Sequence, residues 1–323
     1  MAEWLVEEGI GEDRAVRLDR GSIAGARIRL HGRIAAGDVA DAVLIARSQG
    51  AARGTVRFGG GEEALIDRLP ADAREGAALR TEVTRPALAE RGRFKLALAR
   101  PAPDKPPITL GLAGSLLREG QNAKIVRDFG ADWDELLGEA RDGLVTFSGG
   151  SLAITPTPAM TLIDIDGTAP PRALALAAVP AIAAAIARLD LAGSIGIDFP
   201  TLSAKADRRA VDEALTEALA AWPHERTAMN GFGFVQIVAR LERASLLAAA
   251  AHDPPGCAAR HLLRRAERVA EPGILLIAAA PGVIARITSQ WQAELTRRTG
   301  RVLRLSSDNA LAPEAGFVQA IAL

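Results

Sequence analysis

The segment Met160–Gly167, with the sequence MTLIDIDG, decides the fold prediction because it joins a short apolar run to two aspartates. Upstream, Ser151–Ile154 (SLAI) is typical of a second strand. Downstream, an alanine-rich stretch from about Arg172 to Leu189 predicts a helix, and Gly193–Ile197 (GSIGI) predicts a further strand. This β-β-α-β series indicates an α/β arrangement in which helices cover a sheet.

The alternation of helices and strands continues toward the C-terminus. Lys205–Ala221 predicts a helix and Gly233–Val238 a strand, whereas the stretch Ala249–Pro255, which includes HDPP, interrupts the pattern. A smaller α/β unit is expected after it, with a helix at His261–Val269 and strands at Gly273–Ala278 and Val302–Leu305.

The first 100 residues have a different character, with short alternating segments separated by glycines, which is typical of small antiparallel β structure. Four prolines between Pro101 and Pro107 indicate a linker or surface loop. We therefore predict a mixed α/β protein with a β-rich region (1–100), a linker and connecting region (101–143), an α/β domain (144–250), a linker (251–258) and a small α/β domain (259–323).

The composition excludes several classes of protein. A chain of 323 residues with 49% hydrophobic and 24% charged residues can bury a core, so a disordered or collagen-like protein is excluded. Lysine plus arginine and aspartate plus glutamate both total 39, so the net charge indicates neither nucleic acid nor a membrane surface as a partner. Any site for a polyanion therefore has to be a local patch.

The single cysteine and the apolar stretches bear on location. Cys257 alone can form neither a disulfide within the chain nor a cysteine zinc cluster, which favours a reducing compartment. Met1–Glu8 lacks the basic and then apolar pattern of a signal peptide. The apolar stretches Ala173–Ala187 and Ile274–Ala285 are interrupted by proline and are shorter than a typical membrane span. We expect a cytoplasmic protein with no membrane partner.

Two aspartates stand where apolar strands end: Asp164 after Thr161–Ile163, and Asp198 after Ile195–Ile197. Ligands of α/β sheets bind at this edge, and rigidly held carboxylates suit a hard cation such as magnesium. Asp166 shares a strand face with Asp164 and could join the same ion. Aspartate also commonly ends strands and begins turns, but two such strand ends with a helix between them favour a site.

The segment Asp164–Thr168 (DIDGT) is similar to the opening motif of haloacid-dehalogenase-like phosphatases. That resemblance implies that Asp164 is a nucleophile and Asp166 an acid-base. It also requires a later lysine and a final acidic pair, and only Lys205 follows, in a predicted helix without such a pair. A phosphatase is therefore the least favoured of three hypotheses.

A longer set of segments resembles the ribonuclease E/ribonuclease G family. Ser148–Ile154 with Ala159–Gly167 is similar to its SGGSLVI and AMTVIDVN(S/T)G motifs, and Ala192–Phe199 (AGSIGIDF) to its GGxIVIDF strand. Gly231–Ile237 followed by Arg243–Leu246 resembles its xFGLVEMTRKRxxxSL segment. The three blocks occur in the family's order.

The resemblance implies an architecture. The stretch 144–246 resembles the family's DNase I-like catalytic subdomain, and Glu271–Ile287 resembles its small C-terminal domain. Residues 36–85 would then be a reduced S1/OB-type barrel.

The resemblance also implies a function, which is a magnesium-dependent endoribonuclease acting on single-stranded RNA in RNA processing, including rRNA processing, or decay. Asp164 and Asp198 would hold one magnesium, with Asp166 assisting, and water would attack a phosphodiester. Such cleavage leaves a 5′-phosphate and a 3′-hydroxyl. The RNA-contact candidates are Arg240, Arg243 and Phe232.

The sequence departs from the family in several ways. Asp166 replaces an asparagine, and the basic pair after the last motif is out of register, with Arg240 and Arg243 only nearby. The 5′-phosphate-sensing element is reduced to the loop Pro101–Pro107. The Cys-Pro-x-Cys zinc link is reduced to Cys257, so we expect no structural zinc, and a homo-oligomer, if formed, would not be linked by zinc.

These departures support a rival hypothesis, an RNA-binding or assembly protein that keeps the fold with weak or lost catalysis. A separate basic feature is the helical face formed by Arg260, Arg264, Arg265 and Arg268. We interpret it as a solvated face pairing with Glu267, or alternatively as a phosphate contact.

Overall fold

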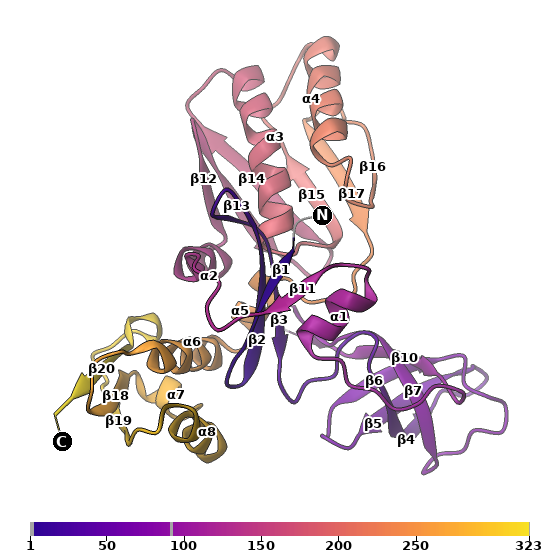
Figure 1. Cartoon of the computed structure of the whole chain (residues 1–323). Coiled ribbons are helices and arrows are strands. Elements are labelled where there is room, and N and C mark those ends of the chain that lie inside the picture. Colours follow the sequence, from indigo (N-terminus) through magenta and orange to yellow (C-terminus); the bar gives the residue numbers. More distant parts are fainter. Residues whose placement is uncertain (1–2, 91–92, 323) are drawn as a thin grey trace.

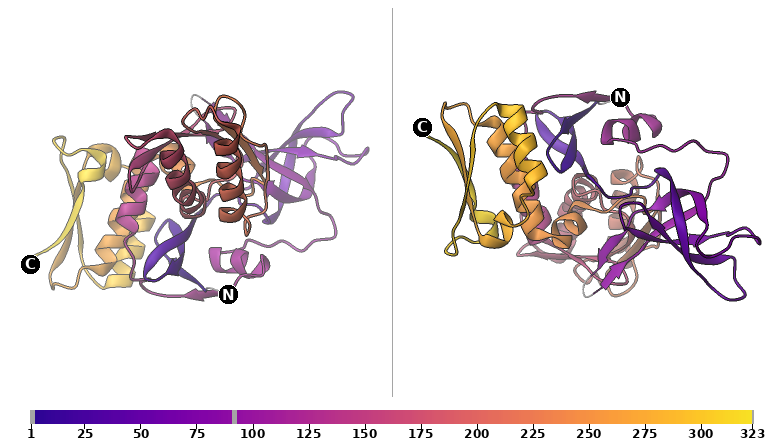
Figure 2. Two further views of the ribbon diagram at one scale, coloured as in Figure 1. Left: turned by 90° about the horizontal axis from the view of Figure 1, so that it is seen from above. Right: turned by 90° about the horizontal axis from the view of Figure 1, so that it is seen from below.

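The computed structural model describes residues 3–90 and 93–322 (Figure 1). It has mixed α/β content, with several separate sheets and one closed five-stranded barrel, and this confirms the predicted α/β class. Figure 2 shows the barrel and the C-terminal unit at opposite ends of the molecule, with the largest sheet and its two helices between them.

A six-stranded sheet in the order β12-β13-β14-β15-β17-β16 contains the aspartate motifs. Only β14 and β15 are parallel, because α3 crosses between them, while every other pair is antiparallel. The elements are β12 (Leu144–Phe147), β13 (Gly150–Pro156), β14 (Thr161–Gly167), α3 (Pro171–Arg188), β15 (Gly193–Asp198), α4 (Lys205–Ala218), β16 (Glu225–Arg226) and β17 (Phe234–Ala239).

The residues of this sheet alternate between two environments. Ile163, Ile165, Ile195 and Ile197 are buried on the face covered by α3 and α4, so the alternate positions face the other side. Aspartates in those alternate positions are therefore held on an open face by an apolar core beneath them.

Helix α3 is long and apolar enough to span a membrane by length and composition alone, whereas the sequence had predicted that this stretch is too short. The helix reaches that length because Pro180 lies on its exposed side and does not end it. Its seven buried residues belong to the core below the sheet, and it packs against α4 and strands β12, β13 and β14. This is the packing of a core helix.

A four-stranded sheet in the order β11-β1-β2-β3 lies beside the six-stranded sheet. Its elements and neighbours are β1 (Trp4–Glu8), β2 (Glu12–Asp19), β3 (Ser22–Leu30), α1 (Leu112–Arg118), β11 (Ala123–Ile125) and α2 (Trp133–Asp142). Strand β11 pairs with β1 in parallel. The stretch 101–143, predicted as a linker and connecting region, thus supplies a strand and two helices to the fold.

The closed barrel has the order β10-β6-β5-β4-β7 and is inserted between β3 and α1. Its strands are β4 (Val39–Arg47), β5 (Arg53–Phe58), β6 (Glu63–Asp67), β7 (Ala78–Arg85) and β10 (Ala97–Pro101), with a hairpin of β8 (Leu88–Glu90) and β9 (Arg93–Lys95) before the last. The barrel therefore spans 39–101 rather than the predicted 36–85. Val39 and Ile108 exchange backbone hydrogen bonds of 2.8 Å where the chain enters and leaves it.

The C-terminal unit contains a three-stranded sheet in the order β19-β18-β20 with its helices. Its elements, with α5 before them, are α5 (Leu246–His252), α6 (Pro254–Arg268), β18 (Ile274–Ala279), α7 (Pro281–Ile284), α8 (Ser289–Thr299), β19 (Leu303–Ser307), the short 3₁₀ helix η1 (Pro313–Ala315) and β20 (Phe317–Ile321). The predicted linker 251–258 is helical, because Asp253 caps α6 and proline is compatible with its first turn.

Helix α6 docks the C-terminal unit onto β1 and β2 through buried ion pairs. Arg260 Nε lies 2.7 Å from Glu12 Oε2, and Arg14 Nε lies 2.6 Å from Glu12 Oε1. Burial raises the pKa of Glu12, but the two arginines lower it further, so the net shift is downward. Arg264 also contacts Glu7, which is fully buried.

The interpretation of the α6 arginines as a solvated face is therefore wrong for Arg260 and Arg264. Their side chains are only 6% and 8% exposed. The phosphate-contact alternative fails for the same two residues, because their guanidinium groups are enclosed by carboxylates of β1 and β2. Helical spacing alone does not distinguish a face turned to solvent from one turned to another domain.

His261 of α6 makes stability depend on pH. Burial lowers its pKa to about 4, Arg14 acts in the same direction, and Asp134, 3.3 Å from Nε2, opposes them. Because the folded-state pKa is below the ordinary 6.5, the unfolded chain takes up the proton first. Stability is then full above about pH 6.5 and falls by about 1–3 kcal/mol as the pH drops toward 4.

Urea unfolding at about pH 7 and about pH 4.5 measures this loss. We expect His261→Gln to reduce the difference in unfolding free energy between the two pH values. His224→Gln is the control and should retain that difference, because His224 is half-exposed and its Nδ1 bonds the backbone carbonyl of Trp222. An unchanged acid-induced loss in His261→Gln would contradict the assignment.

Candidate metal centre

Asp164 and Asp198 are direct neighbours on adjacent strands. In the parallel pair of β14 and β15, the two residues are Cα partners, and Asp198 is the last residue of β15. Neighbouring strands lie about 4.8 Å apart, and directly opposed residues point to the same face. The structure thus brings together two carboxylates that are 34 residues apart in sequence (198 minus 164).

Both side chains are exposed on the open face of the six-stranded sheet. Asp164 Oδ1 accepts a 3.0 Å hydrogen bond from the N–H of Ile165. Within residues 3–90 and 93–322, none of Asp164, Asp166 and Asp198 forms an ion pair, so no paired side-chain cation offsets their charge. Like charges directly opposite each other destabilise a sheet. The opposition of Asp164 and Asp198 is therefore unfavourable unless a cation lies between the two carboxylates.

Asp166 lies one side-chain step further along β14, opposite Ser151 of β13. It shares the open face with Asp164 but is about 6.6 Å away along the strand, beyond the end of the β14–β15 ladder. In the described part of the chain, no group of three or more His, Cys, Asp or Glu side chains is placed to hold a metal. Asp164 and Asp198 are therefore direct neighbours, whereas Asp166 lies one step away from this pair.

Two carboxylates suit a magnesium ion, because this cation usually keeps several waters and takes only one or two carboxylates from a protein. Their oxygens are open to solvent on one face and are fixed by buried strands on the other. The donor set therefore fits such an ion.

An apolar shelf beside the aspartates was not predicted from the sequence. A Cβ added at Gly196 would come within 2.6 Å of Phe234 Cζ, 2.8 Å of Met160 Sδ and 3.0 Å of Leu162 Cδ2. Gly196 thus leaves room for three large side chains to pack over β15, next to Asp198. The glycine within the apolar strand GSIGID was the signal for a close approach of this kind.

Phe232 is held in a fixed turn at the Asp198 end of β15. Asn230 Oδ1 accepts hydrogen bonds from the N–H groups of Phe232 and Phe234, at 2.9 and 3.0 Å. The N–H of Phe199, which follows Asp198, donates to the carbonyl of Gly233 at 3.2 Å. The Phe232 residue is 82% exposed, so a ring face is available to solvent beside the aspartate pair.

The two candidate arginines lie elsewhere. In β17, Phe234 pairs with Asp198 and Ala239 pairs with Gly193. Arg240 follows Ala239, so it lies at the end of β17 opposite to Phe234 and Asp198, roughly 17 Å away along the strand. Arg240 is highly exposed and pairs with Glu242 at 3.1 Å. The structure does not bring it beside Asp198.

Arg243 links two parts of the fold. Its guanidinium lies 3.0 Å from Asp190 and 2.9 Å from Glu119, at the end of α1. Burial lowers the pKa of Arg243, but these carboxylates raise it more, so its charge is retained. Cys257 is buried in α6, and burial raises the pKa of its thiol to about 11. Its thiol therefore stays protonated near neutral pH.

Comparison with known proteins leaves this geometry as the main basis for a function. No protein-family model matches the chain, and no curated protein is detectably similar to it.

Proposed function

We propose that this protein is a magnesium-dependent endoribonuclease of the ribonuclease E/ribonuclease G type, which cleaves single-stranded RNA to leave 5′-phosphate and 3′-hydroxyl ends. The observation that carries the proposal is the direct opposition of Asp164 and Asp198 on parallel strands, where no cation of residues 3–90 or 93–322 forms an ion pair with either carboxylate. The order of the sequence blocks around them supports the same assignment.

The chemistry divides between the metal and the chain. When bound, magnesium supplies polarisation of a phosphoryl oxygen and lowers the pKa of a water. Asp164 and Asp198 would hold it, and the hydrogen bond from Ile165 N–H fixes one oxygen of Asp164. We assign to Asp166, one step along the strand, the role of orienting a water at the scissile phosphate, and to the exposed Phe232 that of stacking on a neighbouring base.

The closed barrel is a second feature that favours RNA as the substrate. Along the chain its strands are β4, β5, β6, β7 and β10, and β6 pairs with β10 in parallel while β7 closes onto β4. This connectivity is that of an OB-type barrel, a module that commonly binds oligonucleotides. The barrel is inserted between β3 and α1, and the family resemblance implies a reduced S1 domain over residues 36–85 of this part of the chain.

A cleavage assay with a fluorescent single-stranded RNA tests the proposal directly. Wild-type protein is incubated with magnesium or with EDTA, and the product ends are analysed. Magnesium-dependent cuts with 5′-phosphate ends, absent in Asp164→Asn, are expected. If purified wild-type protein releases no fragments with magnesium, the nuclease proposal is wrong.

Phe232→Ala is expected to weaken single-stranded RNA binding by about 1–3 kcal/mol, because it removes one base-stacking surface. Fluorescence anisotropy with the same RNA, in EDTA to prevent cleavage, measures the affinity. Phe317→Ala serves as the control, because Phe317 is 40% exposed on β20, at the far end of the molecule. Equal loss in both variants would remove the specific role of Phe232.

The second candidate is an RNA-binding or assembly protein with lost or weak catalysis. It is favoured by Arg243, whose guanidinium is occupied by carboxylates, and by Arg240, which lies far from the aspartates. Under this hypothesis, RNA binding is retained without magnesium and no cleavage occurs under any condition of the assay above.

A further inference from the structure

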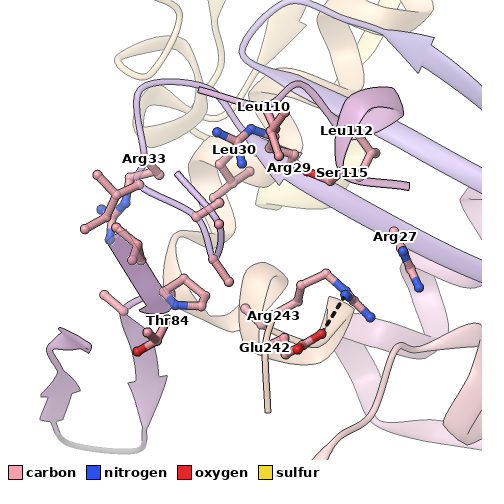
Figure 3. Close-up of a pocket in the computed structure, with 18 of the residues that line it drawn as sticks. Arg27, Arg29, Leu30, Arg33, Thr84, Leu110, Leu112, Ser115, Glu242 and Arg243 are labelled. Carbon is pink, nitrogen blue, oxygen red and sulfur yellow. Dashed lines mark ion pairs between the residues drawn. The ribbon is translucent and has the colours of Figure 1, made fainter. Parts of the chain in front are cut away.

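A pocket of about 340 Å³ lies at the junction of β3, β7, α1 and the segment that leads into α5 (Figure 3). It is separate from the aspartate pair, because Arg240 and Arg243 line it and both follow the opposite end of β17. Its volume is within the range of pockets that hold small ligands. One small molecule, rather than a strand, is therefore the natural occupant.

Arginines dominate the polar lining of this pocket. Seven arginines and four glutamates line it. Two of these arginines form ion pairs with nearby carboxylates: Arg27 lies 2.7 Å from Glu119, and Arg29 lies 2.9 Å from Asp38. In Figure 3, arginines from β3 and Arg243 approach the same space from different sides. The pocket thus presents guanidinium groups from separate elements to one volume.

Three cations surround Glu82 of β7 and give this part of the pocket an excess of positive charge. Arg100, Lys105 and Arg118 lie 2.6, 2.8 and 3.3 Å from its carboxylate oxygens. Three cations share one anion, so this cluster carries a net charge of +2 (3 minus 1).

The exposure of the cluster leaves it open to a second anion. The Glu82 side chain is 6% exposed, whereas Arg100 and Arg118 are 48% and 47% exposed. Burial raises the pKa of Glu82, but hydrogen bonds from Lys105 and Arg100 lower it further, so the carboxylate stays ionised. The cations therefore keep donors directed to solvent beside the pocket, where charge-assisted hydrogen bonds to phosphate form readily.

The rest of the wall is apolar. Ile34, Val83, Pro86, Leu112 and Ala248 line the pocket from the barrel side, from α1 and from α5. Such a wall offers no hydrogen bonds to a bare phosphate, but it can pack against the apolar part of a larger ligand. Guanidinium planes can also stack on nucleic-acid bases. The pocket combines an anion site with an apolar surface.

We propose that this pocket binds a nucleoside monophosphate, with its phosphate on Arg100 and Arg118 and its nucleoside against the apolar wall. This site does not depend on the nuclease proposal. The same chemistry could come from a free nucleotide or from the phosphorylated end of an RNA strand, and the two sources are distinguished by comparing AMP with a 5′-phosphorylated oligonucleotide.

Isothermal titration of the full-length protein with AMP, adenosine and inorganic phosphate tests the site. We expect AMP to bind at least about 10-fold more tightly than either fragment, because charged hydrogen bonds and apolar contacts both contribute. Absence of AMP binding at millimolar concentration overturns the proposal. Phosphate binding as tight as AMP binding also overturns it, because the apolar wall would then contribute nothing.

Two variants probe the two halves of the pocket. Arg100→Gln removes a cation from the cluster, and Ala248→Leu fills the apolar wall without changing charge. Each is expected to weaken AMP binding about 10-fold or more. Arg53→Gln is the matched control, since Arg53 pairs with Asp67 on the exposed side of the barrel.

Thermal unfolding of each variant shows whether it is folded. Unchanged affinity in both folded pocket variants overturns the site, as does equal weakening by the control. A 5′-phosphorylated oligonucleotide that binds more tightly than AMP, and loses affinity in Arg100→Gln, assigns the site to an RNA end. Tighter binding of AMP assigns it to a free nucleotide.

Discussion

Asp198→Asn is expected to reduce magnesium-dependent RNA cleavage by more than about 100-fold, because loss of a metal ligand exceeds the 10- to 100-fold cost of altering groups that only support the ligands. Asparagine has the same shape but carries no charge, so the opposed carboxylates of β14 and β15 no longer share a cation. The initial cleavage rate across a magnesium titration is the measurement. The deficit is expected to shrink at high magnesium, because the lesion is in metal affinity.

Two matched variants make this result specific. Asp207→Asn changes the same charge on α4, where Asp207 pairs with Arg172 at 2.9 Å on the covered side of the sheet, and should leave the rate unchanged. Asp166→Asn should have a smaller effect than Asp198→Asn, because Asp166 lies one step away from the pair. Equal cleavage by Asp198→Asn and wild-type protein would remove Asp198 from the site.

Glu12→Ala is expected to lower the free energy of unfolding by about 3–5 kcal/mol, the usual cost of removing one partner from a buried ion pair. The change leaves Arg14 and Arg260, which are 3% and 6% exposed, without their shared carboxylate. Urea denaturation at neutral pH measures the loss. If the variant does not accumulate as folded protein, Glu12→Gln provides a milder version that keeps a hydrogen-bond acceptor.

The control for this prediction is Glu63→Ala on the barrel. Glu63 pairs with Arg57 at 2.8 Å, and their side chains are 34% and 54% exposed, so a loss of no more than about 1 kcal/mol is expected. A similar small loss at Glu12 would mean that the buried network contributes little to docking.

The position of the aspartate pair could be predicted from the sequence because its determinants are local. Strand-like runs ending in Asp164 and Asp198, with one helix between them, are typical of a crossover that places both strands side by side. The rate assay above tests the role assigned to them. The exposure of Phe232 also depends on a short turn, set by Asn230 and Gly233.

The remaining features depend on contacts between distant residues. Nothing local to Ala123–Ile125 reveals that it pairs with Trp4–Val6, because the partner strand is more than 100 residues away. The arginines of α6 have the spacing of a solvated face, and only the folded chain shows Glu7 and Glu12 opposite them. The pocket likewise draws its walls from the barrel, the four-stranded sheet and α5, so no single segment predicts it.

The burial of Glu7 and Glu12 has a consequence for the order in which the chain assembles. These carboxylates emerge with the first strands during synthesis, but Arg260, Arg264 and Arg268 emerge only after most of the chain has been made. Arg14 of the same strand can pair with Glu12 at once, but the ion-pair partners of Glu7, Arg264 and Arg268, lie on α6. Because an unpaired charge resists burial, we expect the first sheet to complete its packing only when α6 arrives. The barrel between them is closed within residues 39–101 and can fold meanwhile. We therefore expect the inserted barrel to be complete before the part of the protein that surrounds it.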